Sequence, residues 1–196
     1  MPFIIAGTDE AGRGPLAGPV VAAAAILTAE QRDLLLSFGL RDSKKLSARR
    51  RESLFEKICE AGVVWKAQAA SPGRIDRENI LRASLWCMKR AVERLPVVPS
   101  LVLVDGNRLI PGLSIAQRTV IKGDDRVPAI AAASIIAKVL RDRTMDVFDR
   151  IYPQYKLAKH KGYPSALHKQ LIAEYGPSPI HRLSFRGVLA DDREQA

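Results

Sequence analysis

The sequence has few of the features that mark secreted, membrane-bound or thiolate-metal proteins. Its 196 residues include only two cysteines, Cys59 and Cys87. Both fall in segments with helical periodicity, so we expect reduced thiols in or near the core, with no disulfide or metal role. No apolar run approaches the roughly 20 residues of a membrane span. The N-terminus also lacks the basic and apolar regions of a signal peptide. We therefore expect a cytoplasmic protein with no membrane partner.

Aromatic residues are scarce and basic residues are abundant. Phe, Trp and Tyr together make up 6% of the chain, so extensive stacking on nucleic-acid bases is not expected. Lys and Arg outnumber Asp and Glu by 31 to 21, which gives a net charge of +10. This excess favours a nucleic-acid partner contacted through phosphates and sugars. The alternative is a basic soluble protein without such a partner.

An acidic pair followed by a glycine-rich turn organises the chain. Asp9 and Glu10 follow one apolar run, and a second apolar run begins just after the turn. These runs predict two buried strands over residues 3–8 and 19–27, antiparallel because the loop between them is too short for a parallel crossover. Adjacent carboxylates repel each other, so a cation should lie beside them, and a divalent metal is the leading candidate.

The turn Gly12-Arg13-Gly14 has three interpretations. It could be a tight turn with a solvated arginine. It could be a nucleotide-binding loop, although a strand follows it in place of the helix that such a loop requires. It could also be a backbone cradle for the sugar and phosphate of a nucleic acid.

Capping residues, periodicity and breakers predict the remaining elements. Thr28 with Gln31 forms a capping box, and Ser47 and Ser165 are further N-cap candidates. We expect strands over 63–70, 101–106 and within 110–121, helices over 28–38, 47–61, 75–95, 128–151 and 165–176, a charged loop over 122–125 and a basic segment over 152–164.

This order of elements predicts a mixed sheet flanked by helices. The long helix before residue 101 favours a right-handed crossover that places strand 101–106 parallel to the first strand. Asp9 and Asp105 would then lie at adjacent carboxyl ends, where open α/β sheets place their sites. Strand alternation would send Glu10 to the opposite face, so Glu10 must lie beyond the regular strand to share a site with Asp9. Asp124 and Asp125 compete for a further position, and their spacing does not choose between them.

Asp9, Glu10 and Asp105, with one acid of the 124–125 pair, make a plausible hard-cation site. Carboxylates without cysteine or histidine partners suit Mg²⁺ or Mn²⁺, and a pair of such ions could hold a scissile phosphate. The three histidines of the sequence are too scattered to suggest a metal triad. Candidate phosphate contacts are Lys44, Lys45, Lys138, Arg141, Arg143, Lys159 and Lys161, and Tyr163 could meet a ribose 2′-OH.

The segment Asp9–Val21 resembles the signature of type 2 ribonuclease H, the bacterial ribonuclease HII family. Further blocks resemble that family in the same order along nearly the whole chain: Asp42-Ser43-Lys44-Lys45-Leu46, Val104-Asp105-Gly106, Lys122-Gly123-Asp124, Ala131 to Lys138 with Arg141-Asp142, His160 to Pro164, and His181 to Phe185. Two departures flank the Tyr163 block. Lys156-Leu157 stands where Gly-Phe is expected, and Ser165 where Thr is usual.

The resemblance implies an α/β ribonuclease H-like fold with a mixed five-stranded sheet. It implies a catalytic domain over residues 1–151 and a small helical C-terminal extension over 152–196, packed on the same domain. Asp9, Glu10, Asp105 and Asp124 would be the metal-binding catalytic acids, because the family places its fourth acid directly after Lys-Gly or Lys-Ala. Gly12, Arg13, Gly14 and Tyr163 would recognise the ribonucleotide 2′-OH and its junction with DNA.

The implied activity is endonucleolytic cleavage of RNA in RNA/DNA hybrids and on the 5′ side of ribonucleotides embedded in duplex DNA. The products would carry 3′-OH and 5′-phosphate ends, as in ribonucleotide removal and primer RNA degradation. We expect a monomer that uses Mg²⁺ or Mn²⁺. The alternatives are a basic nucleic-acid-binding protein without catalysis, and a nuclease of the same fold that cuts DNA junctions.

Overall fold

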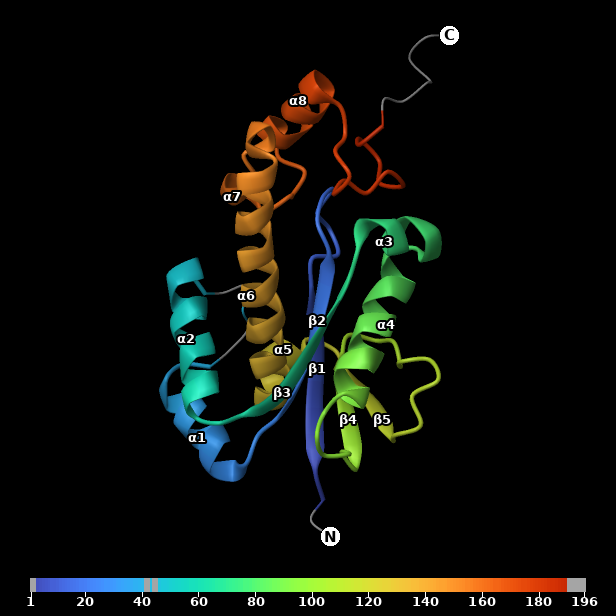
Figure 1. The fold of residues 1–196 in the computed structure, drawn as a ribbon. Coiled ribbons are helices and arrows are strands. Elements are labelled where there is room, and N and C mark those ends of the chain that lie inside the picture. Colours follow the sequence, from blue (N-terminus) through green and yellow to red (C-terminus); the bar gives the residue numbers. More distant parts are fainter. Residues whose placement is uncertain (1–2, 41–42, 44–45, 190–196) are drawn as a thin grey trace.

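A five-stranded sheet with the order β3-β2-β1-β4-β5 forms the centre of the molecule (Figure 1). The structure is a computed structural model that describes residues 3–40, 43 and 46–189. The strands are β1 (Ile5–Ala11), β2 (Val20–Ile26), β3 (Val64–Ala70), β4 (Leu101–Asp105) and β5 (Gln117–Val120).

The pairing of the strands confirms the predicted mixed sheet. β1 runs antiparallel to β2 and parallel to β4, and β3 and β5 extend the sheet at its two edges. Thr8 of β1 lies opposite Val104 of β4 in the parallel register. The next residue of each strand is an aspartate, so Asp9 and Asp105 lie side by side at one end of the sheet, as predicted.

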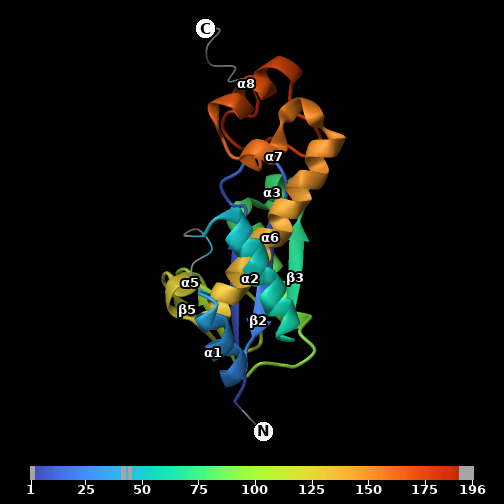
Figure 2. The same cartoon turned by 90° about the vertical axis from the view of Figure 1, so that its left-hand side faces the viewer.

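Helices cover both faces of the sheet, and each face has its own apolar core (Figures 1 and 2). Alternate residues of β2 supply the two cores, because successive side chains of a strand point to opposite faces. One face carries α1 (Ala29–Ser37), α2 (Ala48–Glu60) and α6 (Pro128–Ile151), and the other carries α3 (Pro72–Glu78) and α4 (Ile80–Glu93).

α6 packs unusually close to β1. A Cβ added to Gly7 would lie 2.4 Å from the carbonyl carbon of Ala129, so only glycine fits at position 7. Ala131, Ala132 and Ala133 continue the same contact and are at most 3% exposed. The small residues at the start of α6 therefore serve close packing on the sheet.

Local signals placed most helix ends correctly. Thr28 and Gln31 form the predicted capping box of α1, Ser47 caps α2, and Ser165 caps the last helix. The predicted charged loop over 122–125 is instead a single helical turn, α5 (Gly123–Arg126).

The single long helix predicted over residues 75–95 is wrong. Asn79 has φ of +70° and divides it into α3 and α4, and its side chain accepts a hydrogen bond from the backbone N–H of Arg82 at the start of α4. Ser71-Pro72 begins α3, because Ser71 is its N-cap and proline is tolerated in the first helical turn.

The C-terminal part of the chain lies beyond the end of α6, on the side away from the N-terminus (Figures 1 and 2). It reaches back to the turn after β1, since the Leu16 N–H donates to Gly162 O and the Arg182 N–H to Leu16 O, both at 2.8 Å. The division of the chain at residues 151 and 152 stays a prediction. The short elements here are η2 (Pro153–Tyr155), α7 (Leu157–His160) and α8 (Ala166–Tyr175).

Both cysteines are free thiols. Cys87 is buried in α4, and burial raises the pKa of its thiol to about 12. Cys59 is exposed, so the expectation of a location in or near the core holds only for Cys87. Among the described residues, none of the helices has the length and apolar character needed to cross a membrane.

Candidate active site

Three of the predicted acids meet at the end of the sheet. Asp9, Asp105 and Asp124 each place a carboxylate oxygen within 4.8 Å of the other two. They come from β1, β4 and α5, and the first and last of the three acids are 115 positions apart in the sequence. Such a set of hard oxygen ligands suits a divalent cation of the Mg²⁺ type.

Asp9 is buried, and within the described part of the chain only part of its carboxylate is hydrogen-bonded. Its side chain is 3% exposed, Oδ1 accepts the backbone N–H of Glu10 at 2.7 Å, and Oδ2 has no hydrogen-bond partner among the described residues. Burial raises the pKa of Asp9 well above its ordinary value, and the negative charges of Glu10 and Asp105 raise it further. Burial of a carboxylate oxygen without a donor is unfavourable, and a bound cation would stabilise its negative charge. The residues therefore fit a metal ion.

The helical turn α5, which precedes α6, contains Asp124 and contacts Asp105 at the end of β4. The backbone N–H of Gly123 donates to Oδ1 of Asp105 at 2.7 Å, and this places α5 against the end of β4. Asp124 is 4% exposed and belongs to the acidic group, whereas Asp125 is exposed and does not. The structure thus separates the two candidates that sequence spacing left open.

Glu10 lies inside β1, which continues to Ala11, so the expectation that Glu10 lies beyond the regular strand is wrong. Its side chain is not part of the group formed by the three aspartates. It forms an ion pair with Arg13 at 3.3 Å and lines a second pocket with residues of α4 such as Leu85. Glu10 also lines the cavity next to Asp9 that is described below, so it borders both pockets.

A cavity of about 360 Å³ opens next to Asp9. It brings together side chains and backbone that the sequence analysis singled out from distant segments. The glycine-rich turn forms one wall, and Lys138 of α6 and Tyr163 form another. The predicted members that line it are Asp9, Glu10, Gly12, Arg13, Gly14, Asp105, Lys138 and Tyr163.

Arg141 is not a phosphate contact, which corrects the prediction from its spacing to Lys138. Its side chain is fully buried and donates to the backbone carbonyls of Ala17, Pro19 and Lys161 at 3.0–3.2 Å. Gly12 is required beside it, because a Cβ there would lie 2.1 Å from Arg141 Nε and φ is +97°. Arg141 therefore packs against Gly12 on the buried side and binds the backbone that follows the glycine-rich turn.

Arg182 supports the same turn and was missed in the sequence analysis. It is 0% exposed and donates to the carbonyls of Gly12 at 2.6 Å and of Arg13 and Gly18 at 3.0 Å. Burial lowers the pKa of its guanidinium to about 9. Its only signal in sequence was its place beside His181 in one of the family-like blocks.

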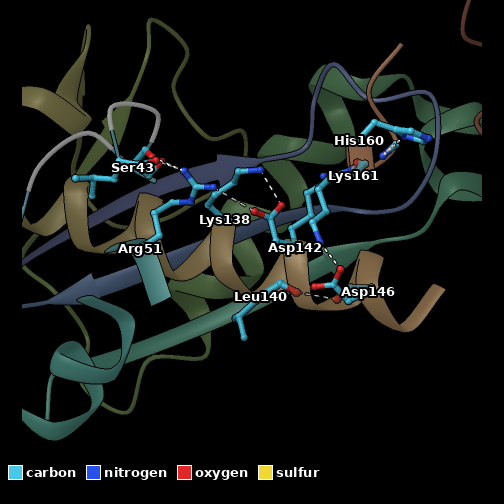
Figure 3. A network of polar contacts seen from close by, with 12 residues as sticks. Ser43, Arg51, Lys138, Leu140, Asp142, Asp146, His160 and Lys161 are labelled. Carbon is cyan, nitrogen blue, oxygen red and sulfur yellow. Dashed lines mark hydrogen bonds and ion pairs between the residues drawn. The ribbon is translucent and has the colours of Figure 1, made fainter. Parts of the chain in front are cut away.

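Lys138 reaches the cavity from an ion-pair network on α6 (Figure 3). Its Nζ lies 2.7 Å from Asp142, and Asp142 also pairs with Arg51 of α2 at 3.6 Å. Arg51 donates to the carbonyl of Ser43 at 3.1 Å, and the Ser43 hydroxyl lies 2.8 Å from that of Ser134, at the cavity wall. The network therefore joins Lys138 to Ser43.

The other basic candidates divide into three groups, one of which is Lys159 alone, exposed in α7. Lys44 and Lys45 lie outside the described residues. Arg143 and Lys161 form ion pairs, Arg143 with an acid of α2 and Lys161 with Asp146 (Figure 3). These pairs lie beside α6 and neutralise part of the basic surface there.

The three histidines are far apart in the sequence but lie close together in the structure. The rings of His160 and His168 stack with centroids 4.3 Å apart, and Nε2 of His168 lies 3.1 Å from Nε2 of His181. They converge because α7, α8 and the segment after α8 fold against one another.

Comparison with known proteins agrees with this fold. A family model described as Ribonuclease HII matches residues 6–188. The Ribonuclease HII of Shewanella oneidensis is 52% identical over 191 residues, which cover 95% of this chain and 90% of that protein.

Two solved structures share the fold over almost their whole length. The crystal structure of the ribonuclease H2 from Pyrococcus horikoshii OT3 matches with a TM-score of 0.79 and 29% identity, over 94% of this chain and 95% of that chain. The structure of the PCNA:RNase HII complex from Archaeoglobus fulgidus matches with a TM-score of 0.79 and 28% identity, over 97% and 99%.

The mixed sheet with acids at the ends of β1 and β4 defines a nuclease of the ribonuclease H class. The chain belongs to the ribonuclease HII family. It is thus a type 2 ribonuclease H, an endoribonuclease that acts on RNA in hybrids.

Proposed function

We propose that this enzyme cleaves RNA/DNA hybrids, and duplex DNA on the 5′ side of single embedded ribonucleotides, in a reaction that depends on Mg²⁺ or Mn²⁺. The products carry 3′-OH and 5′-phosphate ends. The observation that carries the proposal is the convergence of Asp9, Asp105 and Asp124 within 4.8 Å beside the cavity that Tyr163 and the glycine-rich turn line. Its biological roles would be ribonucleotide removal, as part of DNA repair, and primer RNA degradation, by a monomer in the cytoplasm.

Asp9, Glu10, Asp105 and Asp124 are the proposed catalytic acids. Divalent ions bound there would activate the attacking water and stabilise the leaving oxygen. Asp9 has the free Oδ2 for this purpose, and the Gly123 N–H orients the Asp105 carboxylate. Glu10, placed between the two pockets, would act from the α4 side of the site.

The wall of the cavity supplies the proposed contacts to substrate. Arg182 donates to the carbonyls of Gly12 and Arg13 on the buried side, so the other edge of the glycine-rich turn is left to face the substrate. Tyr163 is 43% exposed beside Gly14, in a position to meet the ribose. The proposed substrate contacts are Gly12, Arg13, Gly14, Lys44, Lys45, Lys138 and Tyr163.

The test is cleavage of a duplex that contains one ribonucleotide, with Mg²⁺, with Mn²⁺ and with a chelator. We expect cutting on the 5′ side of the ribonucleotide with either metal and none with the chelator. Uncut substrate under every condition would support a binding protein without catalysis. Equal cutting of an all-DNA duplex would support a nuclease of different specificity.

Neighbouring acids of α5 provide a matched pair of variants. Asp124→Asn should abolish cleavage while duplex binding persists, because this buried carboxylate belongs to the acidic group. Asp125→Asn changes the same charge one position along, at an exposed residue, and should cleave at the unmodified rate. Equal losses in the two variants would contradict the assignment of Asp124.

A further inference from the structure

His181 and His168 form a chain of hydrogen bonds that ends on the backbone of Tyr163, and the ring of His160 stacks on His168. His168 is 0% exposed and His181 is 2% exposed. Nδ1 of His168 lies 3.0 Å from the carbonyl oxygen of Tyr163, and its Nε2 lies 3.1 Å from Nε2 of His181. A buried polar chain of this kind is stable only when each donor meets an acceptor.

The neighbours of the chain fix the proton on each ring. The backbone N–H of Ser178 can only donate, so Nδ1 of His181 accepts and the proton of that ring lies on Nε2. This Nε2–H therefore donates to Nε2 of His168. His168 must then carry its proton on Nδ1, where it donates to the Tyr163 carbonyl, which can only accept. All donors of the chain consequently point toward Tyr163.

His160 holds the same segment through its other neighbours. Its Nδ1 accepts the N–H of Gly162 at 3.2 Å, and its Nε2 lies 3.0 Å from the carbonyl of Tyr155. The ring stacks on His168. Both residues of the pair Gly162-Tyr163 are thus bound by a histidine.

The side chain of Tyr163 faces the cavity while its backbone is held from behind. A Cβ added to Gly14 would lie 3.8 Å from Cε1 of Tyr163, so the ring lies beside the glycine-rich turn. The carbonyl of Gly162 accepts the N–H of Leu16 from this turn at 2.8 Å. Displacement of the backbone at position 163 would therefore move the Tyr163 ring relative to the glycine-rich turn, the proposed binding site of the ribonucleotide.

We infer that His168 is a positioning residue that sets the place of Tyr163 against the substrate, through the bond from Nδ1–H to the Tyr163 carbonyl. His181 supports it by fixing the tautomer of His168. This inference rests on the proposed function, since it requires that Tyr163 contacts the ribonucleotide. It assigns a role in substrate recognition to a buried side chain that touches neither substrate nor metal.

Two substitutions at position 168 separate positioning from packing. The side-chain amide of His168→Asn can occupy the place of Nδ1 and donate to the Tyr163 carbonyl. The longer His168→Gln places its amide near the former Nε2, so it meets His181 but leaves the carbonyl without its donor. Loss of one such bond corresponds to about a two- to tenfold effect. We expect His168→Gln to lose that much kcat/KM on a duplex with a single ribonucleotide, and His168→Asn to keep most of it.

A double-mutant cycle with Tyr163→Ala gives a readout that a purely structural role would not produce. If His168 acts through the Tyr163 ring, His168→Gln should add no further loss in the Tyr163→Ala background. Equal losses for the Asn and Gln variants, or a Gln effect that persists without the ring, would overturn the inference. Thermal unfolding of each variant identifies a loss that comes from unfolding.

The cycle also distinguishes failure of the positioning role of His168 from failure of the proposed contact between Tyr163 and the ribose. If Tyr163→Ala cleaves single-ribonucleotide duplexes at the normal rate, the proposed ribose contact fails and this inference fails with it. If Tyr163→Ala is impaired and His168→Gln is not, the contact stands and only the positioning role of His168 is refuted.

Discussion

Replacing Asp9 by asparagine should abolish activity and at the same time stabilise the metal-free protein. Among the described residues, Asp9 Oδ2 is buried without a donor, and a carboxylate oxygen of Asp9 lies within 4.8 Å of oxygens of Asp105 and Asp124. Asparagine keeps an oxygen for the backbone N–H of Glu10 and places a neutral N–H₂ group at the position of Oδ2. It therefore removes both the buried charge and the repulsion that raise the pKa of Asp9.

The expected gain follows from the burial of the group. Relief of a buried, unfavourable site commonly adds about 0.5–2 kcal/mol. Asp9 is 3% exposed and loses two unfavourable interactions, so we expect the upper part of this range. For a chain of this size, each kcal/mol shifts Tm by roughly 2–4 °C, so Asp9→Asn should melt about 2–8 °C above the unmodified enzyme.

The assay is thermal unfolding at pH 7.5 in chelator and in Mg²⁺, with duplex binding and cleavage measured on the same samples. Mg²⁺ should raise Tm of the unmodified enzyme by mass action, and should raise Tm of Asp9→Asn much less. Asp125→Asn, a charge change at an exposed position, should stay within about 0.5 kcal/mol of the unmodified enzyme in chelator. A lower Tm for Asp9→Asn in chelator, or near-normal turnover, would refute the reasoning.

Three further predictions address the scaffold. Gly7→Ala should lower the free energy of unfolding by about 1–3 kcal/mol in urea, because the new Cβ would lie 2.4 Å from backbone of Ala129; an unchanged midpoint would contradict this. Arg182→Met should lower it by about 2–4 kcal/mol and reduce cleavage, because three buried carbonyls lose their donor; a fully active, equally stable variant would refute the support role. Burial lowers the pKa of His168 and of His181 from 6.5 to about 4, so the unfolded chain binds protons first on acidification and stability is lost as pH falls from about 6.5 to 4. Urea unfolding across this range should show a loss of free energy of unfolding of up to about 3 kcal/mol for each ring. The free energy of unfolding should fall less steeply with pH in His168→Asn, and the same pH dependence in both proteins would contradict the lowered pKa.

Much of this architecture could be predicted from short stretches of sequence. The capping box at Thr28 and Gln31, the cap at Ser165 and the breakers around them involve residues a few positions apart. Their hydrogen bonds form within one turn of chain, so their pattern is visible locally. The two acid-ended strands that place Asp9 beside Asp105 follow the same logic, with the added rule for parallel crossovers.

The errors concern residues whose roles depend on distant partners. Arg141 has the spacing of a surface contact, yet the carbonyls that bind it lie about 120 residues earlier in the chain. The contacts of Arg182 cross about 170 positions, and no local pattern marks them. The division of the long helix at Asn79 depends on a positive φ that neither spacing nor composition had indicated.

The sequence by itself determined the class of the protein: a basic α/β chain with acids at strand ends and a glycine-rich turn suited to a polyanion. Only the tertiary structure decided which side chains face the site. It placed Glu10 between two pockets, drew Arg141 and Arg182 under the turn, and joined three histidines behind Tyr163. The physical reason is that periodicity and capping act over one turn of chain, whereas the environment of a buried polar group is set by whichever segments pack around it.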